Sequence, residues 1–246
     1  MAGMGNSGVL IELEGVVYTY PGGTVPVLDH VDFTFHESER IGLIGPNGSG
    51  KTTLFHIIMG LVKPSAGMVR VFGKNMVKEK DFVMARRGIG LLFQDSDDQL
   101  FCPTVLEDVA FGPLNTGKSF IEARDIAQKT LENVGLSGFE QRITNKLSGG
   151  EKRLVALASV LAMEPRALLL DEPTTGLDET TKARLMTILN QLNKPLILIS
   201  HEYDFLTKTT EILCSMKQGH ITKNGGVHFH HHIHAHVHGD DPHKHE

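Results

Sequence analysis

The chain has 246 residues, of which 40% are hydrophobic, which is enough for one well-buried core or for a core with a subdomain. A formal net charge of −5 argues against a protein that binds nucleic acid through a basic surface. No apolar run approaches the roughly 18 residues that span a bilayer, the N-terminus does not resemble a secretory signal, and the two cysteines stand in unrelated contexts. These features predict a soluble protein of a reducing, cytoplasmic compartment.

The N-terminal segment alternates polar and apolar residues in two places. Val9–Leu13 and Val31–Phe35 both have the period of a half-buried strand, and the turn-rich Tyr20–Gly23 lies between them. This pattern predicts an antiparallel β-layer.

A glycine-rich sequence follows the short apolar strand Ile41–Ile44 and precedes a helical run, Lys51–Met59, whose predicted end is Gly60. It fits the pattern G-x-x-x-x-G-K-[ST], in which glycines let backbone N–H groups approach phosphate oxygens at a helix N-terminus. Lys51 can reach the β- and γ-phosphates, and the Thr52 hydroxyl can bind Mg²⁺. The residues predicted to bind a nucleoside triphosphate are Gly45, Pro46, Asn47, Gly48, Ser49, Gly50, Lys51, Thr52 and Thr53.

The middle of the chain, from Asp81 to Gly150, is expected to be largely helical because it contains charged amphipathic stretches such as Ile121–Val134. Strands resume at Ala167–Leu170 and Pro195–Ser200. Short all-apolar strands interleaved with helices indicate a parallel sheet that is buried on both faces. The predicted fold class is therefore α/β, a P-loop NTPase core with a mostly parallel sheet and an antiparallel β-layer, interrupted by a helical insertion at about residues 95–153.

Two carboxylates, Asp171 and Glu172, directly follow the strand Ala167–Leu170. If this strand ends beside the glycine-rich loop, Asp171 lies near Mg²⁺ and Glu172 lies near the γ-phosphate. One acid could then hold the metal while the other polarises the attacking water. Taken alone, the pair could equally be a solvated acidic strand end.

Five further features occur in the order typical of ABC transporter ATPases. Leu147–Glu151 (LSGGE) resembles the LSGGQ signature, and Thr174–Asp178 follows the acidic pair as in that family. Gln94 stands at the Q-loop position, His201 at that of the switch histidine, and Tyr20 resembles the aromatic residue on which adenine stacks. The resemblance covers residues 9 to 224, and the chain is identified as a member of the ABC ATPase family with the ATPase domain at residues 1–226.

The resemblance also implies a role for each site residue. ATP and Mg²⁺ would be bound, with Thr52, Gln94 and Asp171 supporting the metal. Glu172 would be the general base, and His201 would contact the γ-phosphate and keep the base and water in register. Gln94 is counted with these two as a catalytic residue.

The signature turn begins a predicted helix, so its N–H groups form a second anion site. In the family this site serves the nucleotide of the opposite subunit, which implies that two copies of the chain, as a homodimer, close around ATP. The turn residues are Ser148, Gly149 and Gly150. Glu151 stands where the family usually has glutamine and adds a negative charge near the nucleotide.

The segment Phe93–Phe101, followed by Thr104–Pro113, resembles the ATPases of energy-coupling-factor importers, a group that includes cobalt and nickel uptake systems. In ABC ATPases of this kind the region receives the coupling helix of a membrane subunit. Leu100 and Phe101 are expected to be exposed and to line a groove for that helix, although ordinary subdomain core is the alternative. The implied partners are a second ATPase subunit, an integral membrane coupling subunit and a substrate-binding membrane subunit, at the cytoplasmic face of the membrane, and no nucleic acid.

Nine of the fourteen histidines lie between His228 and His245, in a tail at residues 227–246 that is expected to have no fixed structure without metal. Neutral imidazole favours Ni²⁺, Co²⁺, Cu²⁺ and Zn²⁺. A purification tag is the alternative, but tags are normally unbroken histidine runs. In an extended tail six imidazoles would share one face: His228, His230, His232, His234, His236 and His238.

These patterns predict the ATPase of a transition-metal importer, with nickel or cobalt as the first candidates. The alternatives are an importer for a vitamin or another solute, a soluble ABC ATPase that remodels DNA or ribosomes, and a metal store or chaperone. A remodelling ATPase usually carries a long coiled-coil insertion or two cassettes in one chain, and the sequence has neither.

Overall fold

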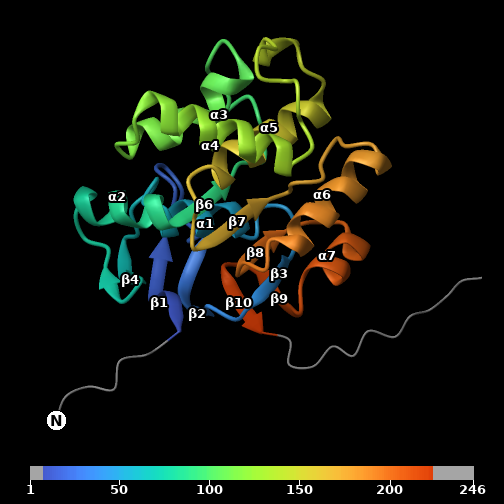
Figure 1. Cartoon of the computed structure of the whole chain (residues 1–246). Helices are drawn as coiled ribbons and strands as arrows, with labels where there is room; N and C mark the ends of the chain where they lie inside the picture. Colours follow the sequence, from blue (N-terminus) through green and yellow to red (C-terminus); the bar gives the residue numbers. More distant parts are fainter. Residues whose placement is uncertain (1–7, 224–246) are drawn as a thin grey trace, which may run out of the picture.

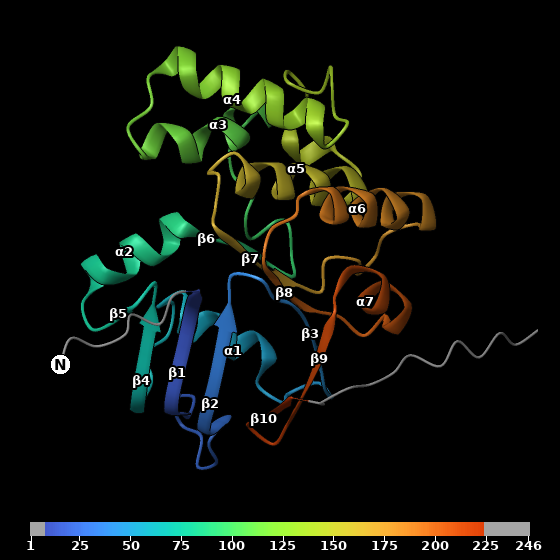
Figure 2. The same cartoon turned by 60° about the horizontal axis from the view of Figure 1, so that its bottom comes forward.

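Two β-sheets organise residues 8–223, the part of the chain that the computed structural model describes (Figures 1 and 2). The smaller sheet is antiparallel and has the strand order β2-β1-β4-β5. Its strands are β1 (Val9–Tyr18), β2 (Leu28–His36), β4 (Ala66–Val71) and β5 (Lys74–Asn75). In the register of β1 and β2, Ile11 pairs with Phe35 and Leu13 with Phe33. The antiparallel layer predicted from the alternating pattern is confirmed.

The larger sheet has the strand order β10-β9-β3-β8-β7-β6. Its strands are β3 (Arg40–Ile44), β6 (Ile89–Leu92), β7 (Ala167–Asp171), β8 (Leu196–Ile199), β9 (Ile212–Lys217) and β10 (His220–Lys223). All neighbours are parallel except β10, which runs antiparallel to β9. Successive residues of β7 face opposite sides, and both sides are buried, so Leu169 joins one core cluster and Leu168 the other. This confirms the predicted α/β fold class.

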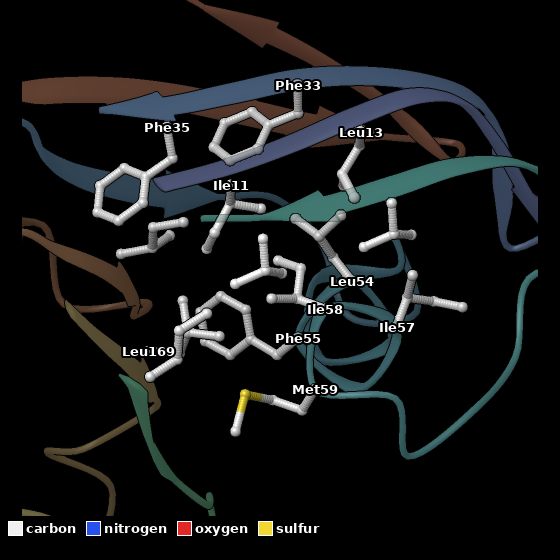
Figure 3. Close-up of a cluster of buried hydrophobic side chains, with 14 of the residues drawn as sticks. Ile11, Leu13, Phe33, Phe35, Leu54, Phe55, Ile57, Ile58, Met59 and Leu169 are labelled. Atoms are coloured by element: carbon white, nitrogen blue, oxygen red, sulfur yellow. The ribbon is translucent and has the colours of Figure 1, made fainter. Parts of the chain in front are cut away.

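The first core cluster lies between the two sheets and surrounds helix α1 (Lys51–Ile58). Figure 3 shows side chains of β1 and β2 on one side of this helix and Leu169 of β7 on another. Phe55 and Ile58 of α1 are fully buried there, and each such side chain contributes roughly 1.5–3 kcal/mol relative to an exposed one. This packing therefore holds α1 against the sheet.

Helix α1 ends as the sequence predicts. Gly60 follows it with a φ of 67°, and the N–H of Leu61 donates to the carbonyl of His56 at 2.8 Å, so the last turn closes through a left-handed residue.

Six more α-helices follow α1 within the described residues. They are α2 (Glu79–Gly88), α3 (Val105–Asn115), α4 (Phe120–Asn133), α5 (Gly149–Leu161), α6 (Glu179–Gln191) and α7 (Tyr203–Thr209). Helices α3, α4 and α5 gather at the end of the molecule opposite β1, β2 and β4 in both views (Figures 1 and 2). We propose that α3, α4 and the first turns of α5 form the helical insertion predicted at about residues 95–153. No helix within residues 8–223 is long and apolar enough to cross a membrane.

One expectation for the middle of the chain is only partly right. The stretch from Asp81 to Gly150, predicted to be largely helical, does contain α3, α4 and most of α2, but the edge strand β6 (Ile89–Leu92) interrupts it and pairs with β7. Its four residues are all buried, and a run this short has no period that separates a strand from a helix. An irregular segment with one 3-10 turn, Thr144–Lys146, also precedes α5.

Candidate functional site

The glycine-rich loop joins β3 to α1, and its glycines meet local demands of the backbone. Gly45 has a φ of 154°, and a Cβ at this position would lie 2.2 Å from the carbonyl oxygen of Met216. Gly50 is the N-cap of α1 with a φ of 104°, and no side chain caps the helix there. The first N–H groups of α1 therefore remain free of side-chain acceptors at the end of the helix that favours anions.

Lys51 lies back over this loop. Its Nζ donates to the carbonyl oxygens of Gly45 at 2.8 Å and Pro46 at 3.1 Å. Burial lowers the pKa of Lys51, and the nearby carboxylates of Glu172 and Asp171 act in the opposite direction. A buried ammonium that is bonded only to carbonyl oxygens is a ready partner for a phosphate oxygen.

A cavity of about 580 Å³ joins this loop to residues that are far apart in the sequence. It contains Tyr20 from the N-terminal layer, Gln94 from after β6, Asp171 and Glu172 from the end of β7, and His201 from after β8. The remaining lining residues are Val27, Asn47, Gly48, Ser49, Gly50, Lys51, Thr52, Thr53, Thr175 and Ile199. The parallel strands explain this convergence, because their carboxyl ends meet at one edge of the sheet.

Glu172 has an unusual backbone conformation. Its φ is 44°, which costs a residue with a side chain roughly 1–3 kcal/mol, and its N–H donates to the carbonyl of Ile199 at 3.0 Å. Burial raises the pKa of Glu172 and also that of Asp171. The fold thus holds two buried carboxyl groups side by side, one of them on a strained backbone.

His201 contacts Glu172 through two of its groups. The backbone N–H of His201 donates to Oε2 of Glu172 at 3.3 Å, and the ring Nε2 lies 3.2 Å from Oε1. The His201 side chain is 53% exposed, whereas that of Glu172 is 10% exposed. His201 therefore lies on the solvent side of the Glu172 carboxylate and can orient it.

Buried oxygens without a hydrogen-bond partner in the described part of the chain, among them those of Ser49 and Asp171, indicate that the cavity is built for a ligand. Ser49 Oγ and Asp171 Oδ1 have no hydrogen-bond partner within residues 8–223, although a buried polar atom without a partner costs about 1–3 kcal/mol. A bound triphosphate would offer acceptors for the hydroxyl, and Mg²⁺ would accept the carboxylate oxygen as a ligand. The donor set of the cavity fits a metal-bound triphosphate.

Tyr20 lies at the rim of the cavity. Its hydroxyl is 2.9 Å from Oγ1 of Thr53, and its ring meets that of Tyr18 edge to face at 5.0 Å. The residue remains 43% exposed, so a face of the ring can take a planar base.

The signature turn does not line this cavity but borders a neighbouring one. Of Ser148, Gly149 and Gly150, none lines the first cavity, and Gly149 lines the adjacent cavity of about 690 Å³. Ser148 caps α5, since its Oγ accepts the N–H of Glu151 at 3.3 Å. A single chain therefore contains the loop of one anion site and, separately, the turn of another.

The contacts that join the signature helix to the Q-loop were not predicted from the sequence. Arg153 is buried and donates to the carbonyl of Phe93 at 2.6 Å and to that of Gln94. Lys152 pairs with Asp97 at 2.6 Å. The available signal was a pair of basic residues immediately before the apolar half of α5.

The expected exposure of the segment after the Q-loop is half wrong. Leu100 is only 9% exposed because it packs into the second core cluster, whereas Phe101 is 65% exposed and its ring meets Phe111 edge to face at 4.7 Å. The six tail histidines, His228 to His238, lie outside the described residues. Among residues 8–223 no group of three or more His, Cys, Asp or Glu side chains is arranged to hold a metal ion.

Comparison with known proteins places this geometry in a family. The model of the family described as "ABC transporter" matches residues 28–175. The chain belongs to the ABC transporter family. Its members bind ATP and Mg²⁺, and the chain is an ATP-hydrolysing subunit of the energy-coupling-factor type.

Three similar proteins refine the assignment. The energy-coupling factor transporter ATP-binding protein EcfA of Methanothermobacter thermautotrophicus is 42% identical over 220 residues, which are 88% of this chain and 70% of that protein. The structure of cbiO1 from Clostridium perfringens, part of the ABC transporter complex cbiONQ, is 33% identical, covers 88% of both chains and has a TM-score of 0.78. The dimeric ATP-binding cassette MJ0796, in a post-hydrolysis state bound to ADP and Pi, is 29% identical, with 88% of this chain and 100% of that chain covered and a TM-score of 0.79.

Proposed function

We propose that this ATPase drives the import of a transition-metal ion, nickel or cobalt, through an energy-coupling-factor transporter in the cell membrane. The observation that carries the ATPase part of the proposal is the single cavity in which the glycine-rich loop, Gln94, the acidic pair and His201 meet. The transport part rests on the similar proteins and on the composition of the tail.

Within the cavity, each group has a proposed task. The loop N–H groups and Lys51 bind the triphosphate, and Tyr20 stacks on the base. Glu172 accepts the proton of the attacking water, and its raised pKa makes it a better proton acceptor than an exposed carboxylate. His201 holds Glu172 in register through the contacts described above.

The residues that would hold Mg²⁺ are Thr52, Gln94 and Asp171. All three line the cavity, and Oδ1 of Asp171 has no partner among the described residues. When bound, the metal would neutralise charge that develops on the phosphate oxygens.

A second copy of the chain completes the site in this proposal. Ser148, Gly149 and Gly150 do not line the chain's own nucleotide cavity, and at the N-terminus of α5 they would contact the nucleotide of the partner. The dimeric state of MJ0796 supports this arrangement.

The membrane partners would be a coupling subunit and a substrate-binding subunit, which place the ATPase at the cytoplasmic face of the membrane as a peripheral protein. The complex to which cbiO1 belongs supports this assembly. On this chain, exposed Phe101 with its neighbour Phe111 supplies an apolar surface for a helix of the coupling subunit.

A vitamin or another solute is the second candidate for the cargo. It is favoured by one observation, which is that no histidine cluster suited to a metal occurs within residues 8–223. Within this chain, the support for a metal cargo therefore comes from the histidines of the tail.

Removal of the tail tests which of the two cargo proposals is correct. Truncation after Gly225 deletes nine histidines and none of the residues assigned to ATP chemistry, so ATP hydrolysis should stay nearly unchanged. Isothermal titration with Ni²⁺ or Co²⁺ should show metal binding by the intact chain that is lost on truncation. Binding by the intact chain should also weaken below pH ~6, because protons compete for imidazoles with an ordinary pKa near ~6.5. Equal metal stoichiometry in the two chains would favour the vitamin or other solute.

A further inference from the structure

The residue after the two signature glycines, Glu151, brings a negative charge to the N-terminus of α5. Its Oε2 accepts the N–H of Ser148 at 2.8 Å, while its own N–H donates to the Ser148 hydroxyl at 3.3 Å. These hydrogen bonds lower the pKa of Glu151, with the backbone N–H of Ser148 as the largest cause. The carboxylate therefore stays ionised at neutral pH, directly beside the turn.

Arg142 forms an ion pair with the second oxygen of this carboxylate. Its Nη1 donates to Oε1 of Glu151 at 3.0 Å. The guanidinium also forms a cation–π contact, because its Cζ lies 3.6 Å from the centroid of the Phe139 ring. The backbone at Arg142 is fixed as well, since its N–H donates to Phe139 and its carbonyl accepts the N–H of Val105 at 3.1 Å.

We propose that Arg142 is a positioning residue of the signature turn, and that it neutralises Glu151 so that the turn can receive the triphosphate of a second copy. This inference rests on the proposed function, in which Ser148, Gly149 and Gly150 contact the nucleotide of the partner chain. Glu151 supplies a strong cap for α5, but its charge repels an incoming phosphate. The guanidinium removes that repulsion while leaving the capping oxygen in place.

One oxygen of Glu151 caps α5 and the other pairs with Arg142, so substitutions can test capping and charge neutralisation separately. Glu151→Gln keeps an oxygen that can accept the Ser148 N–H and removes the charge. Arg142→Met keeps an unbranched apolar side chain against Phe139 and removes the cation. Arg142→Lys keeps the cation without the planar guanidinium.

The experiment measures ATP-dependent dimerisation by sedimentation velocity with MgATP, in a Glu172→Gln background that retains the nucleotide. Dimerisation of this background protein is the first readout, and its absence would reject the proposed function itself. Given dimerisation, Arg142→Met should raise the dimer dissociation constant roughly tenfold, an effect that salt should reduce. The affinity of the monomer for ATP, measured separately, should not change.

Rescue distinguishes charge neutralisation from a merely structural role. The double variant Arg142→Met with Glu151→Gln should return the dimer dissociation constant to within about twofold of the background, and Arg142→Lys should retain most of the dimer affinity. The matched control is Arg166→Met, because Arg166 also pairs with a glutamate, Glu37 at 2.7 Å, and lies over an aromatic ring, Phe72 at 4.3 Å. Unchanged dimerisation in Arg142→Met, or a loss that Glu151→Gln does not reverse, would overturn the inference.

Discussion

Helices α1 and α5 both begin at a glycine-rich turn, yet the two turns treat their first N–H groups differently. At α1 the N-cap is Gly50, no side chain caps the helix, and the first turn contains no acid. At α5 the N-cap is Ser148, which forms a reciprocal capping box with Glu151. One helix end is left open for a ligand and the other is already capped by the chain.

The difference follows from where each turn lies. The α1 turn faces a cavity of the same chain, where buried groups such as Lys51 and Ser49 can hold a ligand. At the α5 turn Ser148 and Gly149 are exposed, and the side chains of Ser148 and Glu151 stabilise the helix N-terminus when no ligand is present. Within the proposed function, a nucleotide first binds at the open turn and then recruits the capped turn of a second chain.

The largest expected effect is that of a variant that cannot hydrolyse ATP, in which the two turns should stay together around the bound nucleotide. Glu172→Gln should lower steady-state ATP hydrolysis by about 10²–10⁴-fold, because the general base is lost while nucleotide binding remains. Phosphate release and nucleotide binding measure the two properties. The control is Glu132→Gln, an exposed glutamate of α4 that should hydrolyse ATP normally. Near-normal turnover of Glu172→Gln would move the role of base to another residue.

The second prediction concerns two variants, each of which should disable one of the two turns. Lys51→Ala should weaken ATP binding to the monomer by roughly 10- to 100-fold, since a charge-assisted contact with the phosphates is lost. Ser148→Arg should leave monomer binding within about twofold of the parent chain and abolish dimerisation, because the arginine fills the exposed turn. Fluorescent-nucleotide titration and sedimentation provide the measurements. Equal loss of monomer binding in both variants would refute the separation of the two turns.

The smallest effect concerns stability without nucleotide. Ser148→Ala should lower the free energy of unfolding by about 1 kcal/mol, because α5 loses its side-chain cap. Ser49→Ala should be neutral or slightly stabilising, since Ser49 Oγ is buried without a partner among the described residues. Urea denaturation of the two variants measures this contrast. A larger loss for Ser49→Ala than for Ser148→Ala would contradict the comparison of an open and a capped turn.

The sequence was sufficient to predict the fold class and to select most residues of the cavity. The reason is that each motif directly follows a strand or begins a helix, and parallel strands bring such positions together at one edge. The P-loop, Asp171 and Glu172 follow this logic, whereas Gln94 and His201 were predicted from the resemblance to ABC ATPases.

Other features depend on long-range packing that no local pattern records. Strand β6 has only four residues and is recognisable only beside β7. Leu100 is buried by the second core cluster although its neighbour Phe101 is not. The bonds of Arg153 to the Q-loop and of Arg142 to Glu151 join segments whose distance in space is set by the fold.

The position of β3 within its sheet bears on how the protein is made. This strand, which carries the glycine-rich loop, lies between β8 and β9, and Ile41 pairs with Ile197 on one side and Ile212 on the other. During synthesis the ribosome therefore releases the loop long before either neighbour of its strand exists, with a delay on the order of ten seconds at ordinary elongation rates. The nascent chain cannot enclose a nucleotide in that interval, and the apolar residues of β3 must be kept from other partners until the C-terminal third has emerged.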